Sequence, residues 1–311
     1  MTAPTTVLLV EDDSADSQLI RRAFEKADFG MSLMRAKDGD DAVAYLDGIE
    51  RYEDREKFPL PCLVLLDIKL PRRSGFEVLS WIRRDPRPLR RMPVVMLTSS
   101  QHTVDINRAY ELGANAYTVK PETNAKLVEL LGSLKEFWIE KNEFPVMAQG
   151  PQFPATQTDA QANRDLVRRI LLVEDERTDA LLITRAFTRA GFPGVVEHAP
   201  DGRLALEWLD KQIAMGIPSL LPSLVLLDMR LPGMSGLELL DAIRSRRELK
   251  RVPVVVLASA QDAETVNRAY ERGANSYLVK SANPDDVGRL IQFVQQYWLI
   301  VNRGSTTAVK N

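Results

Sequence analysis

Cysteine, histidine and long apolar runs are scarce in this chain, and each scarcity excludes a class of protein. The 311 residues include one cysteine, Cys62, and two histidines, so a disulfide framework and a thiol metal site are excluded. No apolar run approaches the roughly 20 residues that a bilayer-spanning helix needs. The first residues lack the basic start and apolar stretch of a signal peptide. We therefore expect a cytoplasmic protein without a membrane partner.

Charge of one sign is not concentrated anywhere either. The net charge is −2 and no lysine- or arginine-rich block occurs, so nothing favours binding to nucleic acid. The composition, 45% hydrophobic and 27% charged, is typical of a soluble globular protein. A chain of this length can form two domains, each of which buries its own core.

The chain does have an internal repeat that covers nearly all of its length. Residues 63–75 return as 224–236, and each copy is an apolar run that ends on an aspartate, Asp67 or Asp228. Residues 7–13 match 170–176, residues 92–101 match 252–261, and residues 107–120 match 267–280. Solenoid repeats have periods of about 20–50 residues, so a period this long indicates two whole domains.

Each half alternates short apolar runs with amphipathic stretches. In the first half we expect strands near 6–10, 31–36, 62–67, 93–98 and 115–119, and helices near 15–27, 39–46, 75–83, 103–111 and 124–138. Strands of unbroken Val, Leu and Ile are typical of a parallel sheet that helices cover on both faces. The pattern predicts an α/β fold of two doubly wound (βα)5 domains, each with a five-stranded parallel sheet.

One segment interrupts the alternation and divides the chain. Residues 142–163 are rich in Pro, Gln, Ala and Thr and lack periodicity, so we expect a linker there. The first domain is then 1–141 and the second 164–304, followed by a disordered tail, 305–311. Gly113 and Gly273 are expected to end the helix before each fifth strand.

Polar residues stand where the predicted strands end. In an open parallel sheet the loops after the strands converge on one crevice. The first half places Glu11, Asp12, Asp67, Thr98 and Lys120 there; the second places Glu174, Asp175, Asp228, Ala258 and Lys280. Crowded carboxylates repel one another unless a cation intervenes, and oxygen ligands suit Mg²⁺. A lysine opposite the metal suits the oxygens of a phosphoryl group.

These residues resemble the site of the receiver domain of two-component signalling, in both halves of the chain. The long connections at 48–61 and 212–222 are similar to those of single-domain response regulators that accompany phytochrome histidine kinases. The endings Phe137-Trp138 and Tyr297-Trp298 carry the same likeness. Two receivers without an output domain also resemble double-receiver chemotaxis regulators. The resemblance implies flavodoxin-like domains and a signalling protein that is not an enzyme.

The resemblance implies a role for each of these residues. Asp67 and Asp228 would accept phosphoryl groups from a sensor histidine kinase or a histidine phosphotransfer protein. Mg²⁺ would be held by carboxylates and one backbone carbonyl in each half: Glu11, Asp12, Asp67 and Lys69, and Glu174, Asp175, Asp228 and Arg230. Lys120 and Lys280 would contact the phosphoryl oxygens.

The resemblance also implies a switch. Thr98 would hydrogen-bond the phosphoryl group and let Tyr117 turn inward. Tyr277 would be the matching switch residue of the second half. The surface of the fourth helix, fifth strand and fifth helix would then change for a downstream protein partner or a homodimer. Ala258 lacks the hydroxyl of Thr98, which predicts a weaker switch in the second domain. Pro121, after Lys120, is the candidate for a cis peptide bond.

Two other functions are weighed against this one. A phosphorylation-independent scaffold or dimerisation adaptor keeps the fold without the switch, and Ala258 leaves that alternative open for the second domain. A hydrolase with an aspartate nucleophile needs an acidic residue two positions later, where Lys69 and Arg230 stand. His102 and His198 are expected to be incidental.

Overall fold

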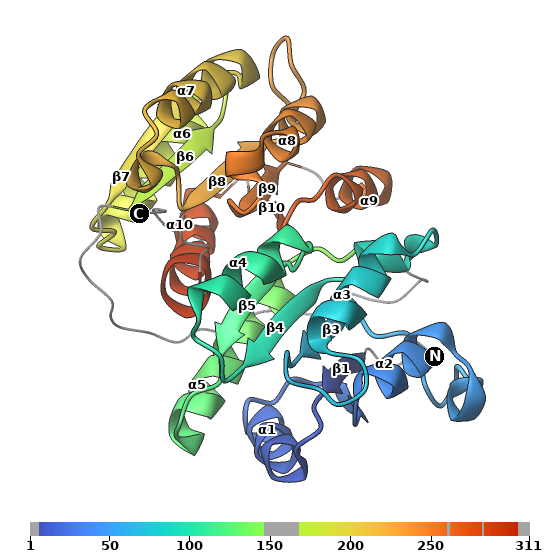
Figure 1. Ribbon diagram of the computed structural model, residues 1–311. Coiled ribbons are helices and arrows are strands. Elements are labelled where there is room, and N and C mark those ends of the chain that lie inside the picture. Colours follow the sequence, from blue (N-terminus) through green and yellow to red (C-terminus); the bar gives the residue numbers. More distant parts are fainter. Residues whose placement is uncertain (1–5, 146–167, 260–261, 282, 304–311) are drawn as a thin grey trace. The chain divides into compact units, whose positions relative to one another are not determined.

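The computed structural model describes residues 6–145, 168–259, 262–281 and 283–303. They fall into two compact units (Figure 1). The first holds residues up to 140 with 144–145, and the second holds 141–143 with those from 168 onward. Most of the predicted linker, 146–163, and the predicted tail lie outside the described residues.

The first unit is a parallel sheet in the order β2-β1-β3-β4-β5. Its strands are β1 (Thr6–Val10), β2 (Ser32–Ala36), β3 (Leu63–Leu66), β4 (Val94–Thr98) and β5 (Ala116–Val119). The helices between and after them are α1 (Ser14–Lys26), α2 (Gly39–Asp47), α3 (Gly75–Arg84), α4 (Thr103–Glu111) and α5 (Asn124–Leu134). Short 3₁₀ turns, Glu50–Tyr52 and Pro88–Arg91, precede β3 and β4.

The second unit repeats this plan in the order β7-β6-β8-β9-β10. Its strands are β6 (Arg169–Val173), β7 (Val195–Ala199), β8 (Leu224–Asp228), β9 (Val254–Ala258) and β10 (Ser276–Val279). Its helices are α6 (Arg177–Arg189), α7 (Gly202–Ala214), α8 (Gly236–Ser245), α9 (Ala263–Glu271) and α10 (Pro284–Val294), with 3₁₀ turns at Pro218–Leu220 and Arg247–Leu249. The predicted fold class is confirmed for both halves.

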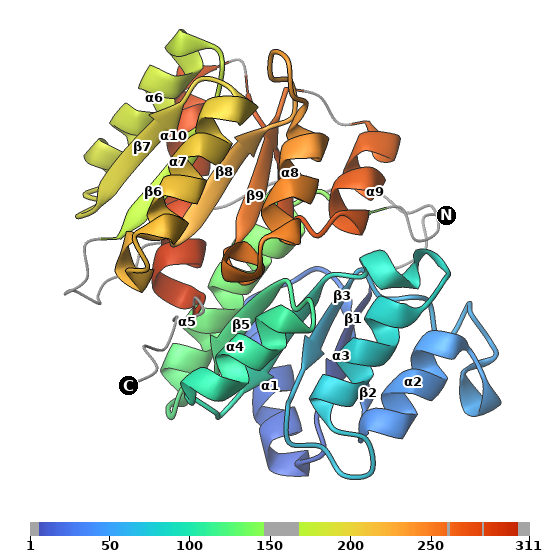
Figure 2. The ribbon, with the colours of Figure 1, turned by 45° about the horizontal axis from the view of Figure 1, so that its top comes forward.

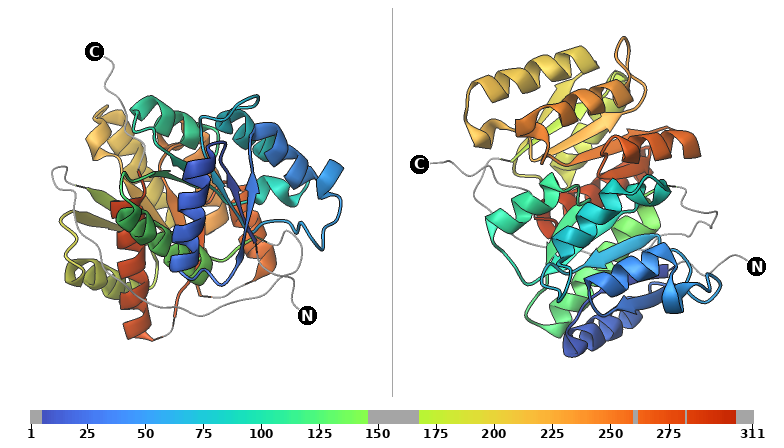
Figure 3. Two further views of the ribbon diagram at one scale, coloured as in Figure 1. Left: turned by 90° about the horizontal axis from the view of Figure 1, so that it is seen from below. Right: turned by 45° about the vertical axis from the view of Figure 1, so that its right-hand side comes forward.

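Helices cover both faces of each sheet, which is why the central strands are apolar throughout. Every residue of β1, β3, β4, β8 and β9 is buried. In the second unit α6 and α10 pack on one face and α7, α8 and α9 on the other (Figure 2). In the first unit α1 packs beside α5 on one face, as a turned view shows (Figure 3). This covering leaves the carboxyl-terminal edges of the sheets for polar side chains.

Local signals set several helix ends, and the ends that follow α4 and α9 are as predicted. α3 and α8 each begin with a capping box, in which Ser74 pairs with Glu77 and Ser235 with Glu238. Gly113 and Gly273 follow α4 and α9 with φ of +90° and +87°, a conformation that glycine adopts without strain.

The last helix of the first unit ends differently from the prediction, and the last helix of the second unit ends in the same way. α5 stops at Leu134 and continues as a π-helical segment, Lys135–Lys141; α10 continues in the same way as Gln295–Val301. π-helical segments are rare and are often found at functional sites. Both segments carry the predicted aromatic pairs, Phe137-Trp138 and Tyr297-Trp298, whose rings meet nearly edge to face.

Candidate phosphoryl-acceptor site

The sheet topology places the acidic residues where the strand order changes direction. The chain runs from β1 to β2 on one side and then crosses to β3 on the other side of β1, and such a reversal is the usual ligand position in these sheets. Glu11 follows β1 and Asp67 follows β3, and these residues are only 1% and 7% exposed. In the second unit Glu174 and Asp228 are equally buried. Burial of carboxylates requires a partner for each.

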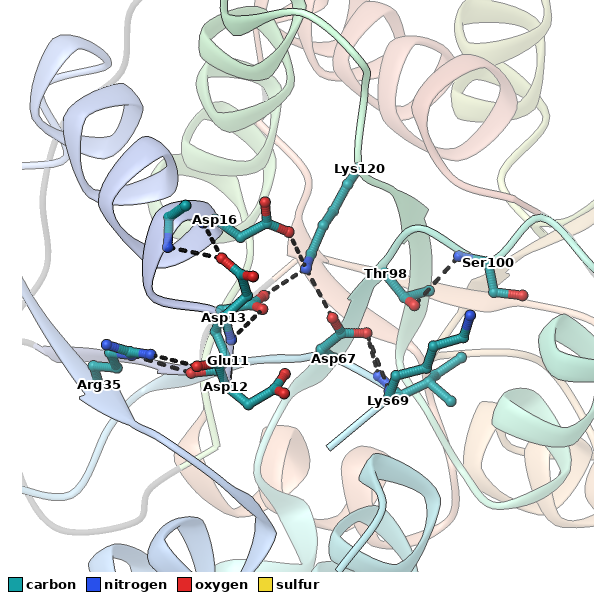
Figure 4. Close-up of polar contacts among 12 residues, drawn as sticks. Glu11, Asp12, Asp13, Asp16, Arg35, Asp67, Lys69, Thr98, Ser100 and Lys120 are labelled. Atoms are coloured by element: carbon teal, nitrogen blue, oxygen red, sulfur yellow. Dashed lines mark hydrogen bonds and ion pairs between the residues drawn. The ribbon is translucent and has the colours of Figure 1, made fainter. Parts of the chain in front are cut away.

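In the first unit that partner is Lys120, which follows β5 (Figure 4). Its Nζ lies 2.5 Å from Oε2 of Glu11, 2.8 Å from Oδ2 of Asp67 and 3.0 Å from Oδ2 of Asp16. The lysine therefore holds carboxylates from β1, β3 and α1 at one point. The predicted acid, acceptor and lysine do meet in space.

The second unit repeats the arrangement almost atom for atom. Lys280 Nζ lies 2.9 Å from Oε2 of Glu174, 2.5 Å from Oδ2 of Asp228 and 3.0 Å from Oδ2 of Asp179. Two independent copies of the same buried geometry indicate a site that is retained for its chemistry, because isolated buried ion pairs stabilise a fold little.

Backbone amides orient the two acceptor aspartates. Oδ1 of Asp67 accepts hydrogen bonds from the amides of Ile68 at 2.6 Å and Lys69 at 3.3 Å. Oδ1 of Asp228 accepts one from the amide of Arg230 at 2.9 Å. In each case the loop amides hold one carboxylate oxygen and the lysine holds the other.

Electrostatics at the site depend on the balance between burial and the lysine. Burial raises the pKa of Glu11 to about 7, although the hydrogen bond and charge of Lys120 oppose the rise. Burial likewise raises the pKa of Glu174 to about 7 against the opposing effect of Lys280. For each lysine, burial lowers the pKa, but the carboxylates outweigh it and the net pKa is raised. The lysines therefore stay charged. The two glutamates are readily protonated near neutral pH unless a further cation stabilises their carboxylates.

The donor set of the second unit fits a hard divalent cation, whereas the predicted trio of the first unit, Glu11, Asp12 and Asp67, does not come as close together. In the second unit, ligand oxygens of Glu174, Asp175 and Asp228 all lie within 4.8 Å of one another. Within the described ranges no other trio of such side chains meets that criterion. Asp12 and Asp175 are the exposed members of their sets, so each can reach an ion from the solvent side. Lys69 and Arg230 have exposed side chains in the loop that follows each acceptor.

The predicted switch residues lie beside the site in the first unit. Thr98 is buried, and its Oγ1 accepts a hydrogen bond from the amide of Ser100 at 3.4 Å. The hydroxyl of Tyr117 donates to the carbonyl of Ser100 at 3.0 Å, so this ring already points inward. Tyr277 is also buried, and Ala258 stands where Thr98 stands in the first unit. The second unit therefore lacks the hydroxyl between acceptor and tyrosine.

Four residues of the site were not predicted from the sequence. Asp16 and Asp179 add a carboxylate from the first helix of each unit to the lysine. Arg35, at the end of β2, donates to the carbonyls of Glu11 at 3.1 Å and Asp12 at 2.9 Å. The matching residue, His198, places Nε2 2.7 Å from the carbonyl of Glu174. This contact gives His198 a structural place beside the acidic loop, and the prediction that the histidine has no part in the chemistry stays a prediction.

One prediction at this edge is wrong. Among the described residues no peptide bond is cis, so the bond before Pro121 is trans. A trans bond is the ordinary form even before proline, where it is favoured by about 0.5–1 kcal/mol.

The comparisons with known proteins agree with this geometry. The family model of the response regulator receiver domain matches residues 7–132 and again residues 170–292. These two matches together cover more than half of the chain, which therefore belongs to the response regulator receiver family, with two receiver domains in tandem.

Over the length of one receiver domain, the chain is similar to several known regulators. It is 42% identical over 134 residues to the probable methanogenesis regulatory protein FilR2 of Methanothrix harundinacea, covering 43% of this chain and 85% of FilR2. It is 37% identical over 142 residues to response regulator Rcp1 of Synechocystis, covering 46% of this chain and 94% of Rcp1.

Solved structures of response regulators also match the length of one receiver domain. The Mn²⁺-bound form of Rcp1 matches with a TM-score of 0.42, covering 46% of this chain and 99% of that one. The phosphorylated cyanobacterial phytochrome response regulator RcpA is 35% identical, with a TM-score of 0.43 and coverage of 46% and 99%. The predicted resemblance to response regulators of the Rcp1 type is confirmed. No helix in the described part of the chain is long and apolar enough to cross a membrane.

Proposed function

We propose that this protein is a two-component phosphotransfer protein in which Asp67 and Asp228 both accept phosphoryl groups. The observation that carries the proposal is the contact of each aspartate with a buried lysine, at 2.8 Å for Lys120 and 2.5 Å for Lys280. The donor would be a sensor histidine kinase or a histidine phosphotransfer protein. We further propose that the protein acts as a regulator and not as an enzyme.

Each residue of the site has its own role in the transfer of the phosphoryl group. An oxygen of Asp67 attacks the phosphorus, the phosphorus–nitrogen bond of the donor histidine breaks, and an acyl phosphate forms. Mg²⁺, held by Glu11, Asp12, Asp67 and the carbonyl of Lys69, would neutralise charge on the transferred oxygens. The loop amides keep Oδ1 of Asp67 oriented while Lys120 leaves the carboxylate for the new phosphoryl oxygens. The second domain offers the same parts in Glu174, Asp175, Asp228, Arg230 and Lys280.

The transferred group would then bias a two-state surface. It carries roughly −1.5 to −2 charges, for which the hydroxyl of Thr98 is a donor in the first domain. Movement of Thr98 pulls the loop that carries Ser100, to which Tyr117 is hydrogen-bonded. The α4-β5-α5 surface follows, and a downstream protein or a second copy of the chain reads it.

The second domain is the weaker switch in this proposal. Ala258 can offer no hydroxyl to the phosphoryl group, so the loop after β9 receives no pull from it. That observation favours a second candidate function for this domain alone: a phosphorylation-independent scaffold or dimerisation module. Replacement of Ala258 by threonine would restore the missing donor.

Intact mass spectrometry tests the proposal. The wild-type chain, Asp67→Asn and Asp228→Asn are incubated with Mg²⁺ and acetyl phosphate. We expect two added phosphoryl groups in the wild type and one in each variant. A single group that only Asp67→Asn removes would assign the scaffold function to the second domain, and no addition with any phosphodonor or kinase would refute the proposal.

A further inference from the structure

The outer edge of the second sheet carries a feature that phosphoryl transfer does not use. β10 is the last strand of its sheet, so its outward backbone groups need partners from elsewhere. Residues 141–143 supply them: Asn142 forms an antiparallel bridge with Leu278, and the amide of Glu143 donates to the carbonyl of Tyr277 at 2.8 Å. These residues belong to the second compact unit although they follow the last helix of the first domain in sequence.

The side chain of Asn142 makes this pairing specific. Its Oδ1 accepts hydrogen bonds from the hydroxyl of Tyr270 at 2.7 Å, the hydroxyl of Ser276 at 2.8 Å and the amide of Tyr277 at 3.2 Å. Asn142 is 5% exposed, and the three donors belong to residues that are almost fully buried. Three buried donors on one oxygen require an acceptor at this point, because buried polar groups without partners are costly.

Three further contacts hold residues 141–143 in place. The hydroxyl of Tyr270 also lies 3.0 Å from the carbonyl of Glu143, and Nδ2 of Asn142 donates to the same carbonyl at 3.1 Å. The ammonium of Lys141 lies 4.7 Å from the centre of the Phe293 ring on α10. The segment thus contacts α9, β10 and α10, the three elements that form the output surface of the second domain.

We propose that the β10 edge is a docking site for residues 141–143 of the same chain, and that this docking holds Tyr277 in its buried position. The segment adds a short strand to a sheet edge. In this recognition mode main-chain hydrogen bonds give affinity, and pockets for side chains give specificity. The regulatory part rests on the proposed function, in which Tyr277 is a switch residue. A partner that reads the α9–β10–α10 surface must compete with residues 141–143 for the edge.

Docking of residues 141–143 would regulate the second domain without the hydroxyl that Ala258 lacks. Both backbone groups of Tyr277 that face outward are held by the segment, through Asn142 Oδ1 and the amide of Glu143. The strand can change its outward bonds only when the segment leaves. Release of residues 141–143 would therefore switch the second domain, as phosphoryl-driven movement of the Thr98 loop would switch the first.

Hydrogen exchange of the full-length chain tests the docking. In Asn142→Ala we expect the amide of Tyr277 to exchange about tenfold faster or more, since one buried acceptor is lost. Amides of β9 serve as the internal reference and should not change. Exchange of Tyr277 at the wild-type rate would overturn the proposal.

Ser276→Ala keeps the test decisive if Asn142→Ala unfolds the domain, which would appear as faster exchange throughout β9. Ala116 occupies the matching position in β5, so the fold accepts alanine there. We expect a smaller increase confined to the β10 edge, and no increase would again overturn the docking.

Phosphorylation distinguishes docking from the proposed function. With acetyl phosphate and Mg²⁺, we expect Asn142→Ala to change the rate of phosphorylation of Asp228 and to leave that of Asp67 unchanged. An unchanged rate at Asp228 would overturn the regulatory role of the segment. If Asp228 accepts no phosphoryl group even in the wild type, the proposed function fails for this domain, while the exchange experiment still decides the docking.

Discussion

Gly75 offers the sharpest single-atom test of the site, because α3 begins against the backbone of the acceptor aspartate. A Cβ at Gly75 would lie 2.0 Å from the carbonyl oxygen of Asp67, whereas ordinary Cβ contacts are 3.4–4 Å. Since Cβ contacts below 3.0 Å are essentially never seen, the backbone must move by at least 1.0 Å (3.0 − 2.0). Overpacking of this kind costs about 1–3 kcal/mol. We expect Gly75→Ala to lower the free energy of unfolding of the first domain by that amount.

The same displacement should impair phosphorylation. The loop that must move carries the amides of Ile68 and Lys69, which orient Oδ1 of Asp67. A misplacement of about 1 Å at a reacting group can cost about 100-fold in rate. We expect the rate of phosphorylation of Asp67 by acetyl phosphate to fall by about that factor, measured by intact mass over time.

Gly132 is the matched control. It lies in α5, and a Cβ there would meet no atom within 4 Å. Gly132→Ala should raise the free energy of unfolding by about 0.5–1 kcal/mol and leave phosphorylation unchanged. Pulse proteolysis in urea can follow each domain separately, since two domains need not unfold together. If Gly75→Ala matched Gly132→Ala in both stability and phosphorylation, the close approach of α3 to Asp67 would be refuted.

Three other changes have defined outcomes. Lys120→Met should destabilise the first domain by about 3 kcal/mol, because Glu11 and Asp67 lose their buried cation; a loss below about 1 kcal/mol would contradict the network. Arg83→Met should cost about 2–4 kcal/mol, because its guanidinium donates four hydrogen bonds to backbone and side-chain oxygens, whereas Arg84→Met, at an exposed position, should stay within about 0.5 kcal/mol. Burial raises the pKa of Tyr270 far above its ordinary value of 10.0. Its folded pKa exceeds the unfolded one, so its contribution is complete below pH 10 and is lost as pH rises further; unfolding of Tyr270→Phe should be less sensitive to alkali, and equal sensitivity would argue against a buried phenol.

The fold could be predicted from the sequence because its signals are local and occur twice. The strand at Thr6–Val10 and the helix at Thr103–Glu111 have the predicted bounds, and the other elements of the first domain up to β5 differ by a residue or two. Unbroken apolar strands and capping boxes depend only on neighbours in sequence. The last helix was predicted to run on to residue 138, but it changes to a π-helical segment at Lys135, for which the periodicity gave no signal.

The acceptor, acid and lysine of the site could also be predicted, since each stands at a strand end. Asp16 could not, because its role depends on the direction in which the first turn of α1 points its side chain. Arg35 reaches the acidic loop across neighbouring strands, which requires the β1–β2 register, with Leu9 opposite Arg35. The bonds of Asn142 to β10 join residues more than 120 positions apart, and a composition typical of a linker concealed them.

The most direct test of the account is a chemical map of the phosphorylated residues. Borohydride reduces an aspartyl phosphate to homoserine, and peptide mass spectrometry then locates the homoserine. After treatment with Mg²⁺ and acetyl phosphate, the account predicts homoserine at positions 67 and 228 and at no other aspartate. Homoserine at another carboxylate, such as Asp12 or Asp175, or its absence from both acceptor positions after treatment with every phosphodonor, would contradict the account.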